Sequence, residues 1–389
     1  MTREGSAVAV ERLSRSRRRS DVAVPATSGD SPRDTARRDA SGTAGYAGTP
    51  AFQLPARLEA HEPPEERGLR RDQVRLLVAS RSAGTIVHTR FDELPRFLEP
   101  GDLLVVNTSG TLPAALPATR PDGTILELRL STPAPRRAAS DWVVELRHGD
   151  APFRDALPRE ELELPAGGRA ELLAPYASSE RLWLAHLDLP NPLERYLELH
   201  GRPVRYRYVP CRWPLDAYQT AFALDPGSAE MPSAGRPLSA ELVTTLVASG
   251  VLVAPVTLHT GVSSPEQHEP PYPERYRVPE ETARLVNAVH AWGGRVIAVG
   301  TTVVRALEST AKPDRSIAGG RGWTNLVLTP ERGLWAVDGL LTGWHEPEAS
   351  HLQLLRAAAG DELLARCYRA ALRHGYLWHE FGDSHLVLP

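Results

Sequence analysis

The chain has 389 residues, of which 41% are hydrophobic and 24% charged, and this composition predicts a packed core large enough for more than one domain. A net charge of −3 argues against a global positive field for nucleic acid, although it allows a local basic groove. Cys211 and Cys367 lack CxxC or metal-ligand spacing, and no long apolar run or signal-peptide core is present, so we expect a reduced cytoplasmic protein without a membrane span.

The first 50 residues are rich in Ser, Arg, Ala, Gly, Thr and Asp and contain almost no large apolar side chains. Such a segment cannot bury enough apolar surface to offset the entropy cost of ordering it, so we expect residues 1–50 to be a disordered tail. Its basic run RLSRSRRRS is interpreted as solvated surface, with contact to RNA as the alternative.

Ordered elements are expected directly after the tail. Apolar and β-branched residues predict strands at 75–80 and 84–91 and a buried strand at Leu103–Val106, with a short helix at 92–98 between them.

The pattern changes between about residues 114 and 205, where short, partly alternating segments are separated by Pro, Gly and Asp. This spacing predicts a small antiparallel barrel or sandwich. We interpret 114–205 as an all-β domain inserted into a larger domain formed by 51–113 and 206–389.

Helical and strand patterns alternate in the C-terminal part, which indicates an α/β domain with at least partly parallel strands. The expected elements are a helix at 239–250, a strand at 251–259, a helix at 279–294, a strand at 295–300, helices at 301–310, 350–360 and 361–375, and a closing strand at 384–388.

Polar groups follow two of these strands, and ligands of α/β proteins bind beyond the carboxyl ends of the strands. His259 ends one strand, and Gly300, Thr301 and Thr302 end another and begin a helix. Helix N-terminal N–H groups favour anions, so a carboxylate or phosphate would fit at residues 300–302. The alternative is a threonine N-cap.

Arg305 and Glu308 lie three residues apart on the helix that follows Gly300, so they can pair with each other on the surface or grip a ligand. His259 is either a structural or a catalytic histidine. His345 lies near Glu346, Glu348 and His351, but the prolines and the lack of a helical HxxxH argue against a metal site. Asp383 follows a glycine and is either a turn residue or functional.

Seven blocks resemble, in the same order, the S-adenosylmethionine:tRNA ribosyltransferase-isomerase family of queuosine biosynthesis. The resemblance extends from about residue 52 to the C-terminus. The blocks are LPARLEAHEPPEERGLRRDQVRLLV, FDELPRFLEPGDLLVVNTSGTLPAAL, YQTAFALDPGSAEMPSAGRPLS, VTLHTG, AVGTTVVRALES, VDGLLTGWHEPEAS and YLWHEFGDSHLVL.

The resemblance implies a large α/β-barrel-like domain with a small inserted β-barrel. It also implies an enzyme that transfers and isomerises the ribosyl group of S-adenosylmethionine onto a 7-aminomethyl-7-deazaguanine base in a tRNA anticodon, forming epoxyqueuosine and releasing adenine and methionine. S-adenosylmethionine is then a substrate, no cofactor or metal is needed, and we expect a monomer that binds tRNA.

For the site, we expect the donor carboxylate at Gly300–Thr302, with Arg305 nearby. A base must remove a proton next to the sulfonium, and His259 is the first choice, His345 the second, with Asp383 or Glu308 orienting the imidazole. The expected substrate-binding residues are Gly300, Thr301, Thr302, Arg305, Glu308, Tyr218, Gln219 and Thr220, and Tyr218 or Trp344 would face the sulfonium or the adenine.

Several blocks depart from the family pattern. PSAGRPLS has Arg236 and Pro237 where the family has leucine and histidine, and TLHTGVSSP lacks the expected Gly-Thr-Phe. HEPPYPE stands in place of a His-x-Met-His pattern, and TGWHEPEAS in place of a TNFHxPxST-like block. NTSG lacks the arginine that the family has in this block. These departures indicate that donor binding is better preserved in this chain than recognition of the acceptor or the tRNA. Two alternatives therefore stay open: a transferase or lyase that uses the same donor on a small molecule, and a non-catalytic donor-binding protein. An electropositive groove beside the strand ends would favour tRNA, and a closed neutral pocket would favour a small molecule.

Overall fold

The computed structural model describes residues 52–177, 179–262, 272–346 and 351–389. The tail expected at 1–50 lies outside the described residues.

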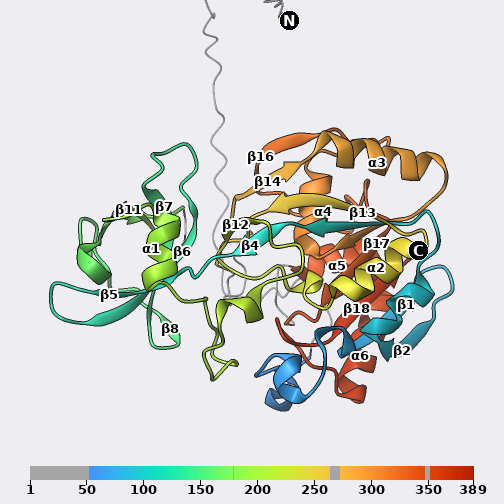
Figure 1. Ribbon diagram of the computed structural model, residues 1–389, viewed down its shortest axis with the longest axis horizontal. Helices are drawn as coiled ribbons and strands as arrows, with labels where there is room; N and C mark the ends of the chain where they lie inside the picture. Colours follow the sequence, from blue (N-terminus) through green and yellow to red (C-terminus); the bar gives the residue numbers. More distant parts are fainter. Residues whose placement is uncertain (1–51, 178, 263–271, 347–350) are drawn as a thin grey trace, which may run out of the picture. The chain divides into compact units, whose positions relative to one another are not determined.

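A nine-stranded mixed sheet forms the centre of the large α/β part (Figure 1). The strands β13, β3, β15 and β17 are parallel neighbours, and β18 runs antiparallel to β17 and parallel to β1. In sheet order the strands are β16 (Gly320–Thr324), β14 (Glu274–Val278), β13 (Leu252–Leu258), β3 (Leu103–Asn107), β15 (Val296–Val299), β17 (Gly339–Gly343), β18 (Ser384–Leu388), β1 (Arg75–Ser80) and β2 (Ile86–Arg90).

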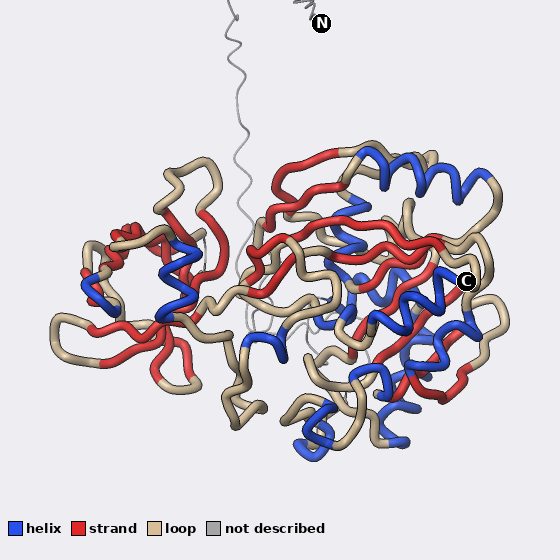
Figure 2. Tube along the Cα trace, in the orientation of Figure 1, coloured by secondary structure: helices blue, strands red, loops and turns tan. Residues whose placement is uncertain are grey.

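Helices cover both faces of this sheet (Figure 2). Alternate residues of each strand point to opposite faces, so Leu103 and Val105 belong to one apolar layer while Leu104 and Val106 belong to the other. The first layer includes α3 (Glu280–Ala291), α4 (Thr301–Glu308), α5 (His351–Ala359) and α6 (Asp361–His374), and the second includes α2 (Ala240–Ala248) and the 3₁₀ helix η4 (Phe91–Phe97). Burial on both faces explains the continuous apolar runs of the central strands.

The all-β segment forms a closed barrel of six strands, because β11 pairs with β7 as well as with β10. The strand order around the barrel is β11, β10, β9, β5, β6 and β7, and β8 extends β7 as a short hairpin. The strands are β5 (Ala115–Thr119), β6 (Ile125–Pro133), β7 (Asp141–His148), β8 (Ala151–Pro152), β9 (Glu161–Glu163), β10 (Arg169–Pro175) and β11 (Leu182–Asp188).

The fold class is confirmed: the protein is α/β with an inserted all-β barrel. The large sheet itself is open, since β16 and β2 each pair with one neighbour in the described residues. One helix was not expected in the inserted segment, because α1 (Leu193–His200) packs Tyr196 and Leu197 into the apolar core of the barrel. The exact domain boundaries stay a prediction.

A short parallel pair, β4 (Ser109–Thr111) and β12 (Asp225–Ser228), lies next to the end of β13. Ser109 Oγ and Ser228 Oγ are 2.6 Å apart, and both are buried. Both cysteines are free, Cys367 buried and Cys211 exposed. Within the described ranges, no helix combines the length and the apolar character needed to cross a membrane.

Candidate functional site

The start of α4 forms the first part of the site. β15 ends at Val299, Gly300 has a φ of 98°, and α4 begins at Thr301. A Cβ at position 300 would lie 3.4 Å from both Ala234 Cβ and Thr302 Oγ1, and the positive φ strains any other residue, so this turn requires glycine. The N–H groups of Thr301 and Thr302 precede the first hydrogen bonds of α4, which Val303 and Val304 donate to the Gly300 carbonyl at 3.1 and 3.3 Å.

This turn lines a cavity of about 230 Å³, which we call the Gly300 cavity. Segments that are far apart in the sequence build its wall. The lining residues are Tyr206, Tyr208, Thr260, His379 and Glu380 together with residues 230–234, 300–302 and 342–346.

Stacked rings form one wall of the Gly300 cavity. The Tyr208 and His379 rings are 3.8 Å apart and nearly parallel at 9°, and Tyr206 stacks on Tyr208 at 5.8 Å. The Tyr208 hydroxyl donates a hydrogen bond of 2.7 Å to Glu380 Oε2. The wall therefore offers flat aromatic faces, which suit a heterocycle or a cation.

Burial sets the charge of this wall. It lowers the pKa of His379 to about 4, with a smaller contribution from His61, so the ring is neutral at physiological pH. Burial also raises the pKa of the Glu380 carboxyl above its ordinary value, although the Tyr208 hydrogen bond opposes this shift. The pKa of Tyr208 is well above its ordinary value for the same reason, so the phenol stays a donor.

His345 is the expected base that lines the Gly300 cavity. Only Trp344 separates it from the end of β17, and its Nε2 is 3.0 Å from Thr342 Oγ1. The Trp378 indole N–H donates to the His345 carbonyl at 3.2 Å, which fixes the backbone of this residue.

His259 lines a second cavity instead, of about 450 Å³, which we call the His259 cavity. Its side chain is buried, with Nδ1 2.8 Å from Ser109 Oγ and Nε2 3.9 Å from Asp225. Burial, and next the charge of Arg275, lowers the pKa of His259 to about 4. A Cβ at Gly227 would lie 2.3 Å from Nδ1, so the glycine makes room for this ring.

The structure therefore does not bring His259 and the Gly300 turn into one cavity. Thr260, the next residue, lines the Gly300 cavity. The two cavities thus lie on either side of the chain at the end of β13.

Arg305 and Glu308 do not pair with each other and do not line the Gly300 cavity. Both side chains are buried. Arg305 forms an ion pair with Glu274 and donates to the carbonyls of Leu326 and Thr324. Glu308 accepts from Arg332 and from the N–H groups of Trp335 and Ala336, each at 2.8 Å. These contacts attach the beginning of β14 and the segment after β16 to α4.

The block Tyr218–Gln219–Thr220 also lies outside the lining of the Gly300 cavity. The Gln219 amide accepts from the N–H of Thr111 at 3.0 Å and donates to its carbonyl at 2.9 Å, like a strand partner of β4. The Tyr218 ring packs 5.2 Å from the ring of Phe381. The Thr220 hydroxyl accepts from the Phe222 N–H.

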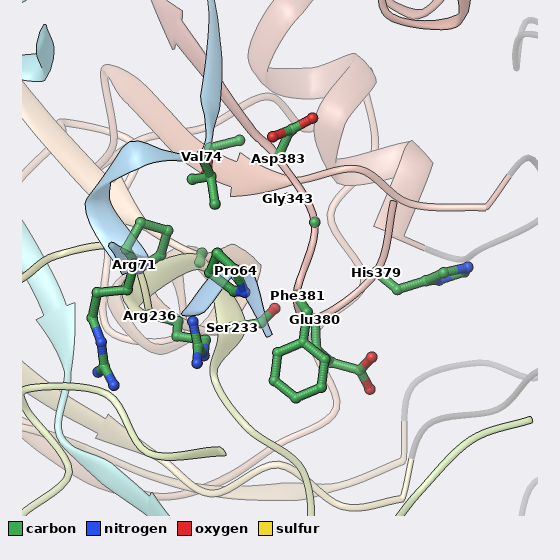
Figure 3. Close-up of a pocket in the computed structure, with 14 residues that line it drawn as sticks. Pro64, Arg71, Val74, Ser233, Arg236, Gly343, His379, Glu380, Phe381 and Asp383 are labelled. Carbon is green, nitrogen blue, oxygen red and sulfur yellow. The ribbon is translucent and has the colours of Figure 1, made fainter. Parts of the chain in front are cut away.

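Asp383 organises the loop that carries His379 and Glu380. Its carboxylate accepts from the N–H groups of Arg75 and Leu377, each at 2.8 Å, and burial raises its pKa. In Figure 3 the Asp383 carboxylate points away from His379 and Glu380. Asp383 is thus placed as a turn residue behind the wall of the Gly300 cavity.

Arg236, at the altered PSAGRPLS block, lines a small adjoining cavity of about 10 Å³ (Figure 3). Its guanidinium is buried, contacts Glu65 at 2.9 Å and donates to the Ala217 carbonyl at 2.9 Å. This residue therefore ties the N-terminal part of the fold to the loop before α2.

Four lining residues were not predicted from the sequence: Tyr206, Tyr208, His379 and Glu380. Two sequence features could have indicated them: the alternating tyrosines of YRYV and the adjacent histidine and glutamate of WHEFGD. In the second segment only Asp383 was predicted as a site residue. Within the described ranges, no group of three or more His, Cys, Asp or Glu side chains could hold a metal ion.

Comparison with known proteins identifies the family. The family model described as "Queuosine biosynthesis protein" matches residues 49–387. An S-adenosylmethionine:tRNA ribosyltransferase-isomerase of Thermus thermophilus is 37% identical over 348 residues, which cover 84% of this chain and 97% of that protein. The enzyme of the same name from Symbiobacterium thermophilum is 36% identical over 349 residues, covering 87% and 98%.

Among solved structures, the S-adenosylmethionine tRNA ribosyltransferase from Thermotoga maritima is 30% identical, covering 87% of this chain and 99% of that one, with a TM-score of 0.49. The match to the family model and the identity to full-length relatives lead to one conclusion: this chain belongs to the queuosine biosynthesis protein family.

Proposed function

We propose that this protein is an S-adenosylmethionine:tRNA ribosyltransferase-isomerase that forms epoxyqueuosine from 7-aminomethyl-7-deazaguanine in tRNA. Two relatives with this name are 36–37% identical to the chain, and the match covers 97–98% of their length. The observation that carries the proposal within the molecule is the Gly300 cavity, because it combines a helix N-terminus with a stacked aromatic wall.

The helix start is the proposed place of the donor's amino acid carboxylate. The N–H groups at the beginning of α4 and the hydroxyls of Thr301 and Thr302 supply donors for a negative charge. Arg305 is left out of this role, because its guanidinium is already bound to Glu274 and to two carbonyls.

The aromatic wall is the proposed place of the adenine or the sulfonium. Both are groups that bind to the faces of aromatic rings, adenine by stacking and the sulfonium by cation–π attraction. Tyr208 and His379 present such faces, and the neutral His379 adds no repulsive charge.

His345 is the proposed general base in place of His259, because it lines the cavity that holds the donor in this proposal. A sulfonium acidifies the neighbouring 5′ carbon, so an imidazole can take that proton while the bond to adenine breaks. The amine of the tRNA base then attacks the ribosyl fragment, and closure of the epoxide expels methionine.

Adenine release tests the proposal. The protein is incubated with S-adenosylmethionine, with and without tRNA that carries 7-aminomethyl-7-deazaguanine. We expect adenine and methionine to form in proportion to modified tRNA, and His345→Gln to retain donor binding while adenine release falls by about 100-fold or more. His259→Gln serves as the comparison.

Other outcomes select other functions. Adenine release that does not depend on tRNA would favour a small-molecule acceptor. Donor binding in calorimetry without any adenine release would favour a non-catalytic protein. Full activity of His345→Gln would remove this residue from the mechanism.

A further inference from the structure

The His259 cavity continues onto an exposed face of β14 and β16, at one edge of the large sheet (Figure 1). These strands are antiparallel, and Arg275 lies opposite Trp323 while Arg277 lies opposite Arg321. Residues directly opposite and two apart in such a pair share one face. We call this set, Arg275, Arg277, Arg321 and Trp323, the β14–β16 basic face.

The cations of this face are poorly compensated. Arg277 and Arg321 lie directly opposite each other, an arrangement of like charges that is unfavourable unless an anion joins them. Asp225 is 3.8 Å from the Arg277 guanidinium and is itself half-exposed. In the described part of the chain, no carboxylate lies within ion-pair distance of Arg275 or Arg321. The other neighbours, Thr257 and the mostly neutral His259, add no negative charge.

Two observations separate this face from an ordinary solvated surface. The apolar layer on this side of the sheet reaches Val253 on β13, whereas β14 and β16 present arginines and an indole instead. Charges that protect a sheet edge belong on the edge strand. Here two of the three arginines are on β14, which pairs with strands on both sides.

Trp323 gives the face a second kind of binding group. Trp323 is 36% exposed, whereas tryptophan is highly buried on average in folded proteins. An exposed aromatic face among guanidinium groups suits single-stranded nucleic acid, because phosphates bind the arginines and an unstacked base stacks on the ring. An acidic peptide would use the charges but would leave the indole without a matching partner.

We infer that the β14–β16 basic face binds single-stranded RNA of the tRNA substrate, with its arginines on phosphates and Trp323 stacked on a base. This inference rests on the proposed function, and it adds the surface that holds the acceptor. The face is close to the reaction site, since His259 lines its cavity while Thr260 lines the Gly300 cavity. The RNA loop is thereby held beside the donor without occupying the donor's place.

Two variants test the inference in the full-length protein. Arg275→Gln with Arg321→Gln should reduce the salt dependence of tRNA binding, by about 0.7 in the slope of log K against log salt for each lost phosphate contact. Trp323→Leu should weaken tRNA binding by about 5- to 150-fold with little change in that slope. Binding is measured by fluorescence anisotropy over a range of NaCl concentrations.

The matched control is Arg284→Gln. Arg284 is an exposed arginine on α3, which packs on the face of the sheet opposite to the arginines of β14. It should leave tRNA binding unchanged. All variants should keep the calorimetric affinity for S-adenosylmethionine, and the variants of the basic face should raise KM for tRNA while kcat and KM for the donor stay the same.

The outcomes distinguish this inference from the proposed function. If the unmodified protein acts on tRNA and the variants bind tRNA as well as it does, the inference is wrong and the proposed function stands. If arginine loss weakens binding but Trp323→Leu does not, the face is a general polyanion surface and the RNA inference is also wrong. If the unmodified protein releases adenine but neither binds nor needs tRNA, both fail.

Discussion

His385 shows how a single residue shapes the wall of the Gly300 cavity. Its side chain is fully buried, its ring stacks on Trp344 at 4.7 Å and 8°, and neither ring nitrogen has a hydrogen-bond partner among the described residues. Burial lowers the pKa of His385 to about 3. The residue therefore supports Trp344, which lines the cavity, at a cost in stability of about 1–3 kcal/mol for unpaired polar atoms.

Replacement of this histidine by an apolar ring should stabilise the fold, and more so in acid. Because the folded-state pKa lies below the ordinary value, the unfolded chain binds protons first as the pH falls below about 6.5, and the free energy of unfolding decreases by up to about 1.4 kcal/mol per pH unit from this group. His385→Phe removes that loss. Its gain, measured by urea unfolding, should be about 2 kcal/mol larger at pH 5 than at pH 7.5.

The other buried histidines are present in both proteins, so their contributions cancel in this difference. An equal gain at both pH values would mean that the His385 imidazole does not titrate differently in the folded and unfolded states.

At the scale of elements, α4 has two separate tasks. Its first turn lines the Gly300 cavity, while its later residues Arg305 and Glu308 hold neighbouring segments. The Arg305–Glu274 ion pair connects α4 to the beginning of β14, and both side chains are largely buried. The same helix therefore lines the Gly300 cavity and holds β14, the strand that carries two arginines of the β14–β16 basic face.

Removal of one member of this ion pair should affect stability rather than donor binding. Arg305→Met leaves the Glu274 carboxylate buried without its cation, which should cost about 3–5 kcal/mol in the free energy of unfolding. Most of this loss should return when Glu274→Met is combined with it, because two apolar groups need no partner. Unfolding curves of the single and double variants measure this effect.

Calorimetry supplies the second measurement for this pair. The folded double variant should bind S-adenosylmethionine with unchanged affinity, since Arg305 does not line the Gly300 cavity. A stable double variant that no longer binds the donor would return Arg305 to the binding site.

At the scale of the whole molecule, the closed barrel has an interior of its own. Its apolar core includes Leu116, Leu128, Val144 and Leu172. A buried charge cluster accompanies this core, in which Glu145 lies 3.1 Å from Arg181 and 3.0 Å from Arg147. Closure of the barrel leaves no unpaired strand edge among its six strands.

The barrel should therefore fold by itself. A fragment of residues 112–206 should unfold cooperatively when circular dichroism is followed during urea titration. Glu145→Leu should destabilise the fragment by about 3–5 kcal/mol, because buried guanidinium groups lose their carboxylate. A fragment without a cooperative transition would mean that the barrel depends on the larger domain.

Much of the fold could be predicted from the sequence, because its central strands are buried on both faces and therefore appear as uninterrupted apolar runs. Residues 251–259 and 295–300 are such runs, and β13 and β15 lie within them. The strands β14 and β16 could not be identified in this way. Their sequences, ERYRV and GRGWT, place arginines on an exposed face and have few apolar residues.

The candidate site could be predicted only where local sequence determines it. The turn at Gly300 follows from a buried strand, a glycine and a helix start. The contact between Tyr208 and Glu380 joins residues that are 172 positions apart, and nothing in either local sequence indicates it. The expected role of Arg305 depended on a free guanidinium, whereas the fold places Glu274 of β14 next to this residue of α4.

Two adjacent residues at the end of β13 line different cavities, and this arrangement has a consequence for how substrates bind. His259 and Thr260 belong to two compartments of about 450 and 230 Å³, so a molecule in one compartment leaves the other open. Under the proposed function, donor and acceptor can then be present together, and neither must leave before the other arrives. The backbone that joins His259 to Thr260 borders both compartments.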